Sequence, residues 1–379
     1  MDNRWDVCIL SMSDVAYDAR TLNVARSFAR QGYRICLIGW GDAAAYRQLQ
    51  PYGIAALLRP RPTARRVRWQ WLLFALWLLQ HWQRLHARAY WAADLYGLPF
   101  AASLARMHQA CLFYDSREIF AALAALRKRP LMQRIHQWVE RRYIRSVHRC
   151  IVSGKLDAEL LQRRYHLRTA PLVLLNVPPY RVPVRTDRIR HHLRLPPHST
   201  VLLYQGAVHE GRGIEHGIRL LCRLPEVVLC ILGDGAYRPT LEQMAADFRV
   251  SDRVFWLGWR PYDELLDWTA SADIGLALIE PISQSYELAL PNKVFEYCMA
   301  GIPTIATALP ALRELFEQYR IGILLSVDFS LEELGRAVRT LRIPEVWQQY
   351  HDRCRKAATH LCWEAQHPKL AELLETPSC

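Results

Sequence analysis

Residues 204–215 combine glycines with a charged side chain in a pattern that suits anion binding. The segment leaves an apolar run, passes glycines that include Gly206 and Gly213, and enters a helical pattern. Glycine lets backbone amides approach a ligand closely, and the amino end of a helix adds positive potential. Arg212 would donate paired hydrogen bonds to a diphosphate. The segment therefore predicts a phosphate site, with an ordinary glycine-rich turn as the alternative.

Two further loops follow strand-like runs in the same half of the chain. The turn Gly233-Asp-Gly235 comes directly after the run that ends at Leu232. Gly235 is compatible with close approach of a ligand at the same sheet edge, although such a turn alone is more often structural. The backbone of Gly258-Trp-Arg260 is the candidate to contact a nucleotide base, with Arg260 as its charged side chain.

The richest segment covers residues 288–305. Pro291 can occupy the first turn of a helix, which leaves the amides of Asn292 and Lys293 near the positive helix end. Glu296 lies about one turn further, where a carboxylate could reach a ribose diol while the helix terminus holds the phosphates. A solvated carboxylate on a helix surface is the alternative for Glu296.

These loops need strands and helices to position them, and both halves of the chain supply such elements. In the first half, strands are expected over residues 6–10, 34–39, 110–114 and 150–153. In the second half, they are expected over residues 201–204, 227–232, 254–257, 274–278, 304–306 and 322–325. Helical patterns lie between most of these runs, so each half predicts a doubly wound parallel sheet.

The predicted domain organisation follows from this alternation and from the length of 379 residues. Prolines without periodicity indicate a linker. We expect an N-terminal domain over 1–178, a linker over 179–195, a C-terminal domain over 196–344, and helices over 345–379 that pack back on the N-terminal domain. Parallel sheets bind ligands at the carboxyl ends of their strands, so a cleft between the domains is the expected active site.

Four segments in this order resemble family 4 glycosyltransferases over nearly the whole chain. They are residues 206–213, residues 233–235, the run Pro-Asn-Lys-x-Phe-Glu-Tyr-x-x-Ala-Gly-x-Pro at 291–303, and Trp-Glu-x-Gln at 363–366. The resemblance implies the GT-B architecture, in which two Rossmann-like domains face a central cleft. It also implies transfer of a sugar from a nucleotide diphosphate sugar with retention of anomeric configuration.

The resemblance assigns roles in the second half residue by residue. Arg212 matches the second basic residue of the family's diphosphate pair, and Glu296 matches the second Glu of its Glu-x7-Glu motif, which binds the donor ribose. The chain departs from the family at the first basic position, which is Ala207, and at the first Glu position, which is Leu288. Lys293 is the candidate that replaces the missing cation.

The resemblance also implies that two loops of the first half serve the acceptor and the donor phosphates. One loop covers residues 13–20. The other, Asp115-Ser-Arg-Glu118, resembles the Asp-x-His-Glu of related enzymes, with arginine in place of histidine. The candidates are therefore Asp18, Arg20, Asp115, Arg117 and Glu118. A helix-surface arginine is the alternative for Arg20.

The basic charge of the chain belongs to one half. Residues 1–178 hold 27 Lys and Arg against 11 Asp and Glu, a net charge of +16, whereas the remainder holds 22 against 25, a net charge of −3. A partner with phosphate groups that faces the first half alone is indicated. No nucleic-acid-binding motif accompanies the charge, so an anionic membrane surface is the expected partner.

A Trp-rich, Arg-flanked stretch over residues 59–90 supports a membrane partner. Its apolar core is too short to span a bilayer, and Trp and Arg suit the headgroup boundary. Burial of Trp69, Trp77 or Trp82 in the interface is expected, and a second basic stretch over 127–145 adds basic charge and Trp138. A helix buried against the N-terminal sheet is the alternative. Both interpretations can hold, since one helix can bury one face and present the other to lipid.

The remaining expectations concern cofactors and location. The ten cysteines show no metal-like spacing and are expected to be reduced, and the start of the chain lacks the pattern of a secretory signal. We therefore expect a cytoplasmic protein, peripheral on the inner face of the cell membrane. Neither Asp-x-Asp nor clustered histidines occur, so no metal and no cofactor is expected beyond the nucleotide-sugar co-substrate.

The best interpretation is a metal-independent, hexosyltransferase-type glycosyltransferase that acts on an envelope polysaccharide or a lipid-linked acceptor. A nucleotide-sugar epimerase of the same architecture is the first alternative. A catalytically silent binding protein is the second. The departures at Ala207 and Leu288 favour the silent protein, whereas Arg212, Lys293 and Glu296 argue against it. Fold alone does not separate the three.

Overall fold

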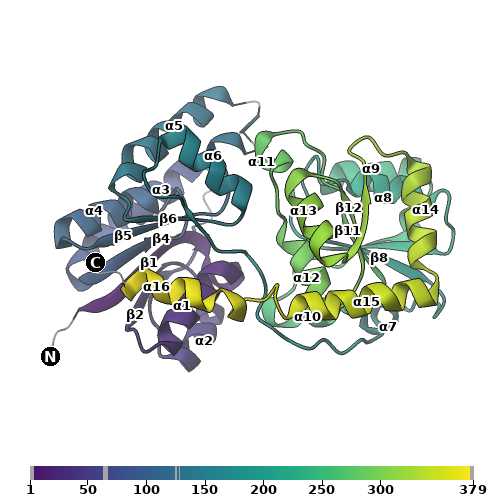
Figure 1. Ribbon diagram of the computed structural model, residues 1–379, viewed down its shortest axis with the longest axis horizontal. Helices are drawn as coiled ribbons and strands as arrows, with labels where there is room; N and C mark the ends of the chain where they lie inside the picture. Colours follow the sequence, from purple (N-terminus) through teal and green to yellow (C-terminus); the bar gives the residue numbers. More distant parts are fainter. Residues whose placement is uncertain (1–3, 63–66, 124–125, 128, 376–379) are drawn as a thin grey trace. The chain divides into compact units, whose positions relative to one another are not determined.

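The computed structural model describes residues 4–62, 67–123, 126–127 and 129–375. The chain folds into two compact α/β units, both shown in Figure 1. The first comprises Met1–Asn176 together with Gln366–Cys379, and the second comprises Val177–Ala365.

The first unit is built on a seven-stranded sheet in the order β3-β2-β1-β4-β5-β6-β7. Its strands are β1 (Trp5–Asp14), β2 (Ile35–Trp40), β3 (Ala55–Arg59), β4 (Ala87–Ala92), β5 (Cys111–Ser116), β6 (Arg149–Val152) and β7 (Leu172–Val173). Every neighbouring pair is parallel. All loops that follow strands therefore leave from one edge, and all loops that enter strands arrive at the other.

Helices cover the first sheet and join its strands. They are α1 (Ala19–Arg30), α2 (Ala43–Leu49), α3 (Val67–His81), α4 (Leu98–His108), α5 (Pro130–Tyr143), α6 (Lys155–Tyr165) and α16 (His367–Glu375). Asp18 caps α1, because its side chain accepts a hydrogen bond from the backbone N–H of Thr21. Helix α16 joins this unit from the far end of the chain and packs against α1.

The second unit is built on a six-stranded sheet in the order β10-β9-β8-β11-β12-β13. Its strands are β8 (Thr200–Gln205), β9 (Val227–Leu232), β10 (Val254–Trp256), β11 (Ile274–Ala277), β12 (Thr304–Thr307) and β13 (Gly322–Leu325). Its helices are α7 (Arg188–Leu193), α8 (Ile214–Leu221), α9 (Arg238–Asp247), α10 (Tyr262–Thr269), α11 (Gln284–Glu287), α12 (Asn292–Ala300), α13 (Pro310–Tyr319), α14 (Leu331–Leu341) and α15 (Pro344–Ala358). All of its strand pairs are parallel.

Strand β8 shows why this sheet must be covered on both sides. Leu202 and Tyr204 belong to one buried cluster, whereas Val201 and Leu203 belong to another. Successive side chains of a strand point to opposite faces, so each face of the sheet has its own core. The doubly wound architecture expected for both halves is confirmed.

The boundaries between the units differ in detail from those expected. Residues 179–195 lie in the second unit and include α7, whose Ile189 is fully buried. The tail divides between the units: α15 packs against α12 of the second unit, and α16 packs in the first. A proline-rich composition marks irregular backbone here, but the buried Ile189 and the ion pairs of Arg185 and Arg190 with Asp273 attach the segment to the second unit.

One expectation about the cysteines is wrong. Eight cysteines, including Cys8 and Cys36, are free, but Cys111 at the start of β5 is disulfide-bonded. Sequence spacing gave no sign of this bond, because pairing depends on which thiols the fold brings together.

Candidate functional site

The candidate loops of the second unit leave from the carboxyl edge of its sheet. From β8 the chain moves outward to β9 and β10 and then returns to β11 on the other side of β8. The strand order reverses between β8 and β11, the place where doubly wound sheets bind ligands. The loops after β8, β9 and β10 carry Gly206–Gly213, Gly233–Gly235 and Arg260 to this edge.

Two of the glycines are required by close backbone packing. A Cβ atom on Gly213 would lie 1.9 Å from the carbonyl oxygen of Leu278, and the glycine has a φ of +72°. A Cβ atom on Gly235 would lie 2.2 Å from the carbonyl oxygen of Val208. These contacts hold the loops after β8, β9 and β11 together. Internal packing explains both glycines, independently of any ligand.

Lys293 is buried in the first turn of α12, with 7% of its surface exposed. Its Nζ lies 3.6 Å from the centroid of the Tyr204 ring, and no described residue forms a hydrogen bond with it. Burial, and then the neighbouring Arg212 guanidinium, lower the pKa of Lys293 well below its ordinary value. Lys293 contacts the face of an aromatic ring, and the charge of Glu296 opposes only part of these effects on its pKa. An anionic ligand would therefore stabilise its charged form.

Arg212 is the second cation of this edge. Its guanidinium carbon lies 4.3 Å from the centroid of the Tyr286 ring. Its Nε is buried without a hydrogen-bond partner among the described residues, and no described carboxylate pairs with it. The Tyr204 hydroxyl donates to the carbonyl oxygen of Ala207 at 2.6 Å and so shapes the loop that carries Arg212. The two cations lie at one edge without an ion-pair partner.

Glu296 lies one turn after Lys293 on α12 and is half-buried. The side-chain amide of Gln205, the last residue of β8, donates to its Oε2. The other end of the Gln205 amide lies 2.6 Å from the Thr269 hydroxyl, which also lies 2.8 Å from the carbonyl oxygen of Leu265. Burial raises the pKa of Glu296 to about 7, against the opposing effects of Gln205 and Lys293.

Gln205 and Thr269 were missed by the sequence analysis. Both are buried, and together they hold the Glu296 carboxylate in one orientation. The sequence does carry a signal for Gln205, because this polar residue ends a mainly apolar strand just before the glycine loop. Thr269 closes α10 and carries no such signal.

The other donor-side candidates occupy different positions along the same edge. Pro291 is the N-cap of α12 and Asn292, its first residue, is exposed. The Arg260 guanidinium carbon lies 4.3 Å from the centroid of the Trp268 ring, and its Nε is buried without a partner among the described residues. No described contact links Arg260 with Lys293 or Glu296.

In the first unit, four of the five candidates form one buried ion-pair network. Arg20 binds Asp115 at 2.7 Å through side chains that are 1% and 0% exposed, and it also donates to the carbonyl oxygen of Leu174. Arg117 binds Asp18 at 2.6 Å and lies 3.4 Å from Asp115. This network lies at the carboxyl ends of β1 and β5, where the sequence analysis placed it.

The charges of this network compensate one another. Burial acts to raise the pKa of Asp18, but Arg117 and the hydrogen bonds from Thr21 outweigh burial and lower it. Glu118 stands outside the network, because its side chain is exposed. Its charge, together with burial, which is the larger cause, raises the pKa of Asp157 to about 6.

The sequence was compared with protein families, curated proteins and solved structures. Residues 185–360 match the family model of glycosyl transferases group 1. The match covers most of the second unit, including Arg212, Lys293 and Glu296.

Curated relatives agree with that family. The chain is 28% identical over 158 residues to a lipopolysaccharide core biosynthesis glycosyltransferase, LpsE, from Rhizobium meliloti (strain 1021). This alignment covers 42% of this chain and 43% of LpsE. The chain is 26% identical over 129 residues to the N-acetyl-alpha-D-glucosaminyl L-malate synthase of Bacillus anthracis, which covers 34% of this chain and 32% of that protein. Both alignments take in less than half of the relative's length.

Among solved structures, Anabaena Alr3699/HepE in complex with UDP-glucose matches the whole architecture. The TM-score is 0.78 at 15% identity, with 98% of this chain and 100% of that chain covered. The fold is GT-B, as predicted. None of the described helices is both long and apolar enough to cross a bilayer.

Proposed function

We propose that the chain is a glycosyltransferase that moves a sugar from a nucleoside diphosphate sugar to an envelope polysaccharide or a lipid-linked acceptor. The observation that carries the proposal is the pair of cations, Arg212 and Lys293, which lack a carboxylate partner at the carboxyl edge of the second sheet. Two uncompensated charges beside a helix amino end are costly in the empty protein and suit a diphosphate.

The two cations would act on the leaving diphosphate. Breaking the bond between the sugar and the diphosphate leaves negative charge on the phosphate oxygens, and fixed cations stabilise that charge in the transition state. Arg212 can bind two oxygens at once, whereas Lys293 acts as a point charge. Because these side chains supply the positive charge, we propose that transfer needs no metal ion. Unchanged turnover in excess EDTA is the expected result.

Glu296 would orient the donor. Its carboxylate is held by Gln205 and can accept hydrogen bonds from the hydroxyls of a donor ribose. The half-buried position of Glu296 leaves an oxygen for the ligand, while the Gln205 amide is held between Glu296 and Thr269. Lys293 and Glu296 are one helical turn apart, which matches the separation of the diphosphate from the ribose.

Binding and turnover test this proposal directly. The full-length protein is mixed with UDP, ADP, GDP and their sugar conjugates, and its melting temperature is followed, because a ligand of the folded state raises stability. HepE was solved with UDP and UDP-glucose, so UDP is the first nucleotide to test. A rise with one nucleoside diphosphate that disappears in Arg212→Ala supports the donor site. No rise with any of them contradicts it.

The reaction itself distinguishes the alternatives. We propose a hexosyl transfer with retention, so the product linkage should have the anomeric configuration of the donor, which NMR of the product shows. LpsE is named for lipopolysaccharide core biosynthesis, so lipopolysaccharide core acceptors are tested first. Epimerisation of the donor without an acceptor, or nucleotide binding without any turnover, would replace the transferase proposal.

We further propose that the first unit holds the protein peripherally on the inner face of the cell membrane. Helix α3 buries Phe74 and Trp77 in the core but exposes Leu72, Leu76 and Leu79 at helical spacing. Trp77 stacks on Trp40 with ring centroids 6.3 Å apart. Of the three tryptophans, Trp77 is therefore not a candidate for the interface, because it belongs to the protein core, whereas Trp69 and Trp82 are exposed.

Helix α5 presents a matching surface. Leu131, Ile135 and Trp138 are exposed on it, beside the exposed Arg134 and Arg141. Helix α4 connects the two helices, since it packs against α5 and its Phe100 lies 4.7 Å from the Trp71 ring of α3. Exposed apolar side chains beside arginines suit a headgroup layer. Arg65 and Arg66, which belong to the same expected surface, lie outside the described residues.

Vesicle flotation tests the membrane proposal. Each basic residue near an anionic bilayer contributes about 1 kcal/mol. Replacing Arg134, Arg141 and Arg145 by Glu should abolish flotation with phosphatidylglycerol vesicles. The matched control replaces the exposed Arg219, Arg223 and Arg355 of the second unit and should float like the wild type. Equal binding to neutral and anionic vesicles would contradict the electrostatic part of the proposal.

A further inference from the structure

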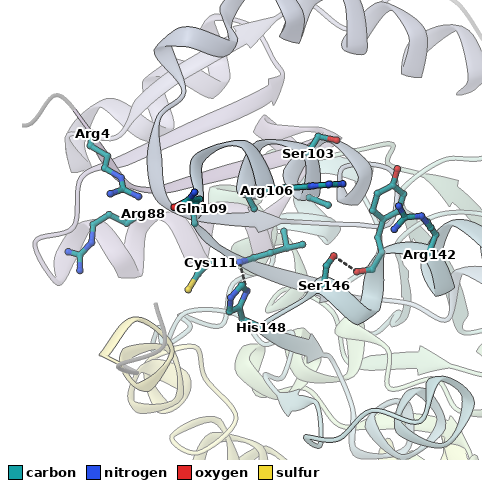
Figure 2. Close-up of a pocket in the computed structure, with 14 residues that line it drawn as sticks. Arg4, Arg88, Ser103, Arg106, Gln109, Cys111, Arg142, Ser146 and His148 are labelled. Atoms are coloured by element: carbon teal, nitrogen blue, oxygen red, sulfur yellow. Dashed lines mark hydrogen bonds between the residues drawn. The ribbon is translucent and has the colours of Figure 1, made fainter.

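A cavity of about 690 Å³ opens at the amino edge of the first sheet. Figure 2 shows four arginines around it, which come from four separate elements. Arg4 precedes β1, Arg88 lies on β4, Arg106 lies in the last turn of α4, and Arg142 lies in the last turn of α5.

The lining of this cavity is basic without a compensating acid. No Asp or Glu is among its described lining residues. Arg106 and Arg142 are exposed and form no ion pair or hydrogen bond with the described part of the chain. Among the described residues, the exposed Arg88 pairs with the half-buried Asp6 at 3.6 Å. Arg4 donates to the carbonyl oxygen of Ala87, but its Nε is buried without a partner among the described residues.

Helix dipoles explain part of this arrangement but not all of it. An arginine in the last turn of a helix interacts favourably with the negative helix end, which accounts for Arg106 and Arg142. Arg4 and Arg88 come from strand segments, where no such effect operates. Their convergence with the helix arginines on one cavity therefore needs another reason.

Uncharged donors complete the lining. The backbone N–H of Leu112 donates to Nδ1 of His148 at 3.0 Å, so the neutral ring carries its hydrogen on Nε2. Ser103 and Gln109 also line the cavity and are exposed. Guanidinium groups, an imidazole N–H, an amide and a hydroxyl are the groups that bind phosphate oxygens.

We propose that this cavity binds a ligand with two or more closely spaced phosphate groups. Its volume lies within the range of about 300–1,000 Å³ typical of small-molecule sites. Its arginines are distributed over four elements rather than gathered at one point, which suits several phosphates rather than one.

The cavity is separate from the carboxyl-edge network of the same unit. Leu112 and His148 lie at the starts of β5 and β6, whereas Asp115 and Arg117 lie at the end of β5. A strand rises about 3.3 Å per residue, so the six residues of β4 separate the two edges by roughly 17 Å. The cavity is therefore distinct from the acceptor-side candidates of the first unit.

Calorimetric titration with sodium tripolyphosphate at constant ionic strength tests the proposal. Tripolyphosphate should bind at least tenfold more tightly than orthophosphate. The double variant R106Q/R142Q should weaken it by roughly tenfold per arginine, since one charge-assisted hydrogen bond contributes about 1.5–3 kcal/mol. The matched control R219Q/R223Q, with two exposed arginines of the second unit, should bind like the wild type.

Two further arms keep the result specific. Arg212→Gln should retain tripolyphosphate binding while it loses nucleotide binding, so the failure of one site does not imply the failure of the other. Flotation with phosphatidic acid vesicles distinguishes lipid headgroups from a soluble ligand as the source of the phosphates. If tripolyphosphate competes with the vesicles for the wild type and R106Q/R142Q floats more weakly, the phosphates belong to lipid headgroups. Unchanged flotation assigns them to a soluble ligand. Tripolyphosphate binding that is unchanged in R106Q/R142Q or lost in Arg212→Gln overturns the proposal.

Discussion

The carboxyl edges of the two sheets use their cations in opposite ways. In the first unit, Arg20 and Arg117 are paired with buried carboxylates. In the second, Arg212 and Lys293 have no carboxylate partner among the described residues. A buried pair fixes local structure, whereas a buried cation without a partner is a cost that an anionic ligand offsets. The comparison indicates which edge is built to receive an anion.

The largest expected effect is a loss of stability when a paired arginine of the first unit is replaced. Arg20→Met removes the closer cationic partner of the Asp115 carboxylate, which is 0% exposed, and leaves it, among the described residues, only Arg117 at 3.4 Å. Loss of one member of a buried ion pair costs about 3–5 kcal/mol. The free energy of unfolding in urea should fall by that amount. Arg30→Met, at an exposed arginine of the same helix, should change it by less than about 0.5 kcal/mol. Equal losses in both variants would show that the pairing is unimportant.

The next effect concerns turnover and the residues proposed for the donor site in the second unit. Arg212→Ala and Glu296→Ala should each lower kcat by roughly 10²-fold, because each removes a proposed contact to the donor. Melting temperatures should stay close to that of the wild type. Glu287→Ala is the matched control, since Glu287 is exposed and directly precedes Leu288 at the position where the family carries its first Glu. A large loss in Glu287→Ala would move the ribose contact to that residue.

A smaller effect separates binding from stability at one residue. Lys293→Met removes a buried cation without a partner, so the free energy of unfolding should rise, by about 1 kcal/mol. Affinity for the nucleoside diphosphate should fall by about tenfold, the value of one charge-assisted contact. Urea unfolding and calorimetry measure the two changes. A loss of stability in Lys293→Met would place Lys293 with the paired arginines of the first unit.

The smallest effect concerns pH. An unfolded Glu loses its proton near its ordinary pKa of 4.5, whereas burial keeps Glu296 protonated to about pH 7. The folded state therefore binds more protons between these values, and the contribution of Glu296 to stability declines as pH rises through that window. Nucleotide affinity should rise over the same window, because the ionised carboxylate accepts hydrogen bonds from the ribose better. Glu296→Gln should flatten both profiles, and profiles that keep their slope would exclude Glu296 as the titrating group.

Much of the second unit could be predicted from the sequence because its strands are buried on both faces. Val227–Leu232 is a continuous apolar run, which a strand covered by helices on two sides requires. Strands β3 and β4 carry weaker signals: β3 is only half-buried and ends at Arg59, and β4 includes the exposed Arg88.

The site was only partly predictable, and the reason is long-range contact. The positions of the charged residues after strands identified them as candidates, but the sequence did not indicate which of them pair with one another. Arg117 binds Asp18 across 99 residues of sequence, which no local pattern encodes. Lys293 is predictable as a cation at the start of a helix, whereas its lack of a partner depends on what β8 places beside it. Trp77 shows the same limit, since only the fold decides which face of an apolar helix is covered.

Helix α16 has a consequence for the order in which the protein forms. Leu370, at 0% exposure, and Leu373 complete the core of the first unit, and Lys369 donates to the carbonyl oxygen of Val173. These residues leave the ribosome only after the whole of Val177–Ala365 has been made. Domains fold as units during synthesis, generally from the N-terminus. We therefore expect the first unit to lack the Leu370 and Leu373 contacts until its neighbour has been made, and to be more accessible to chaperones and proteases during that time.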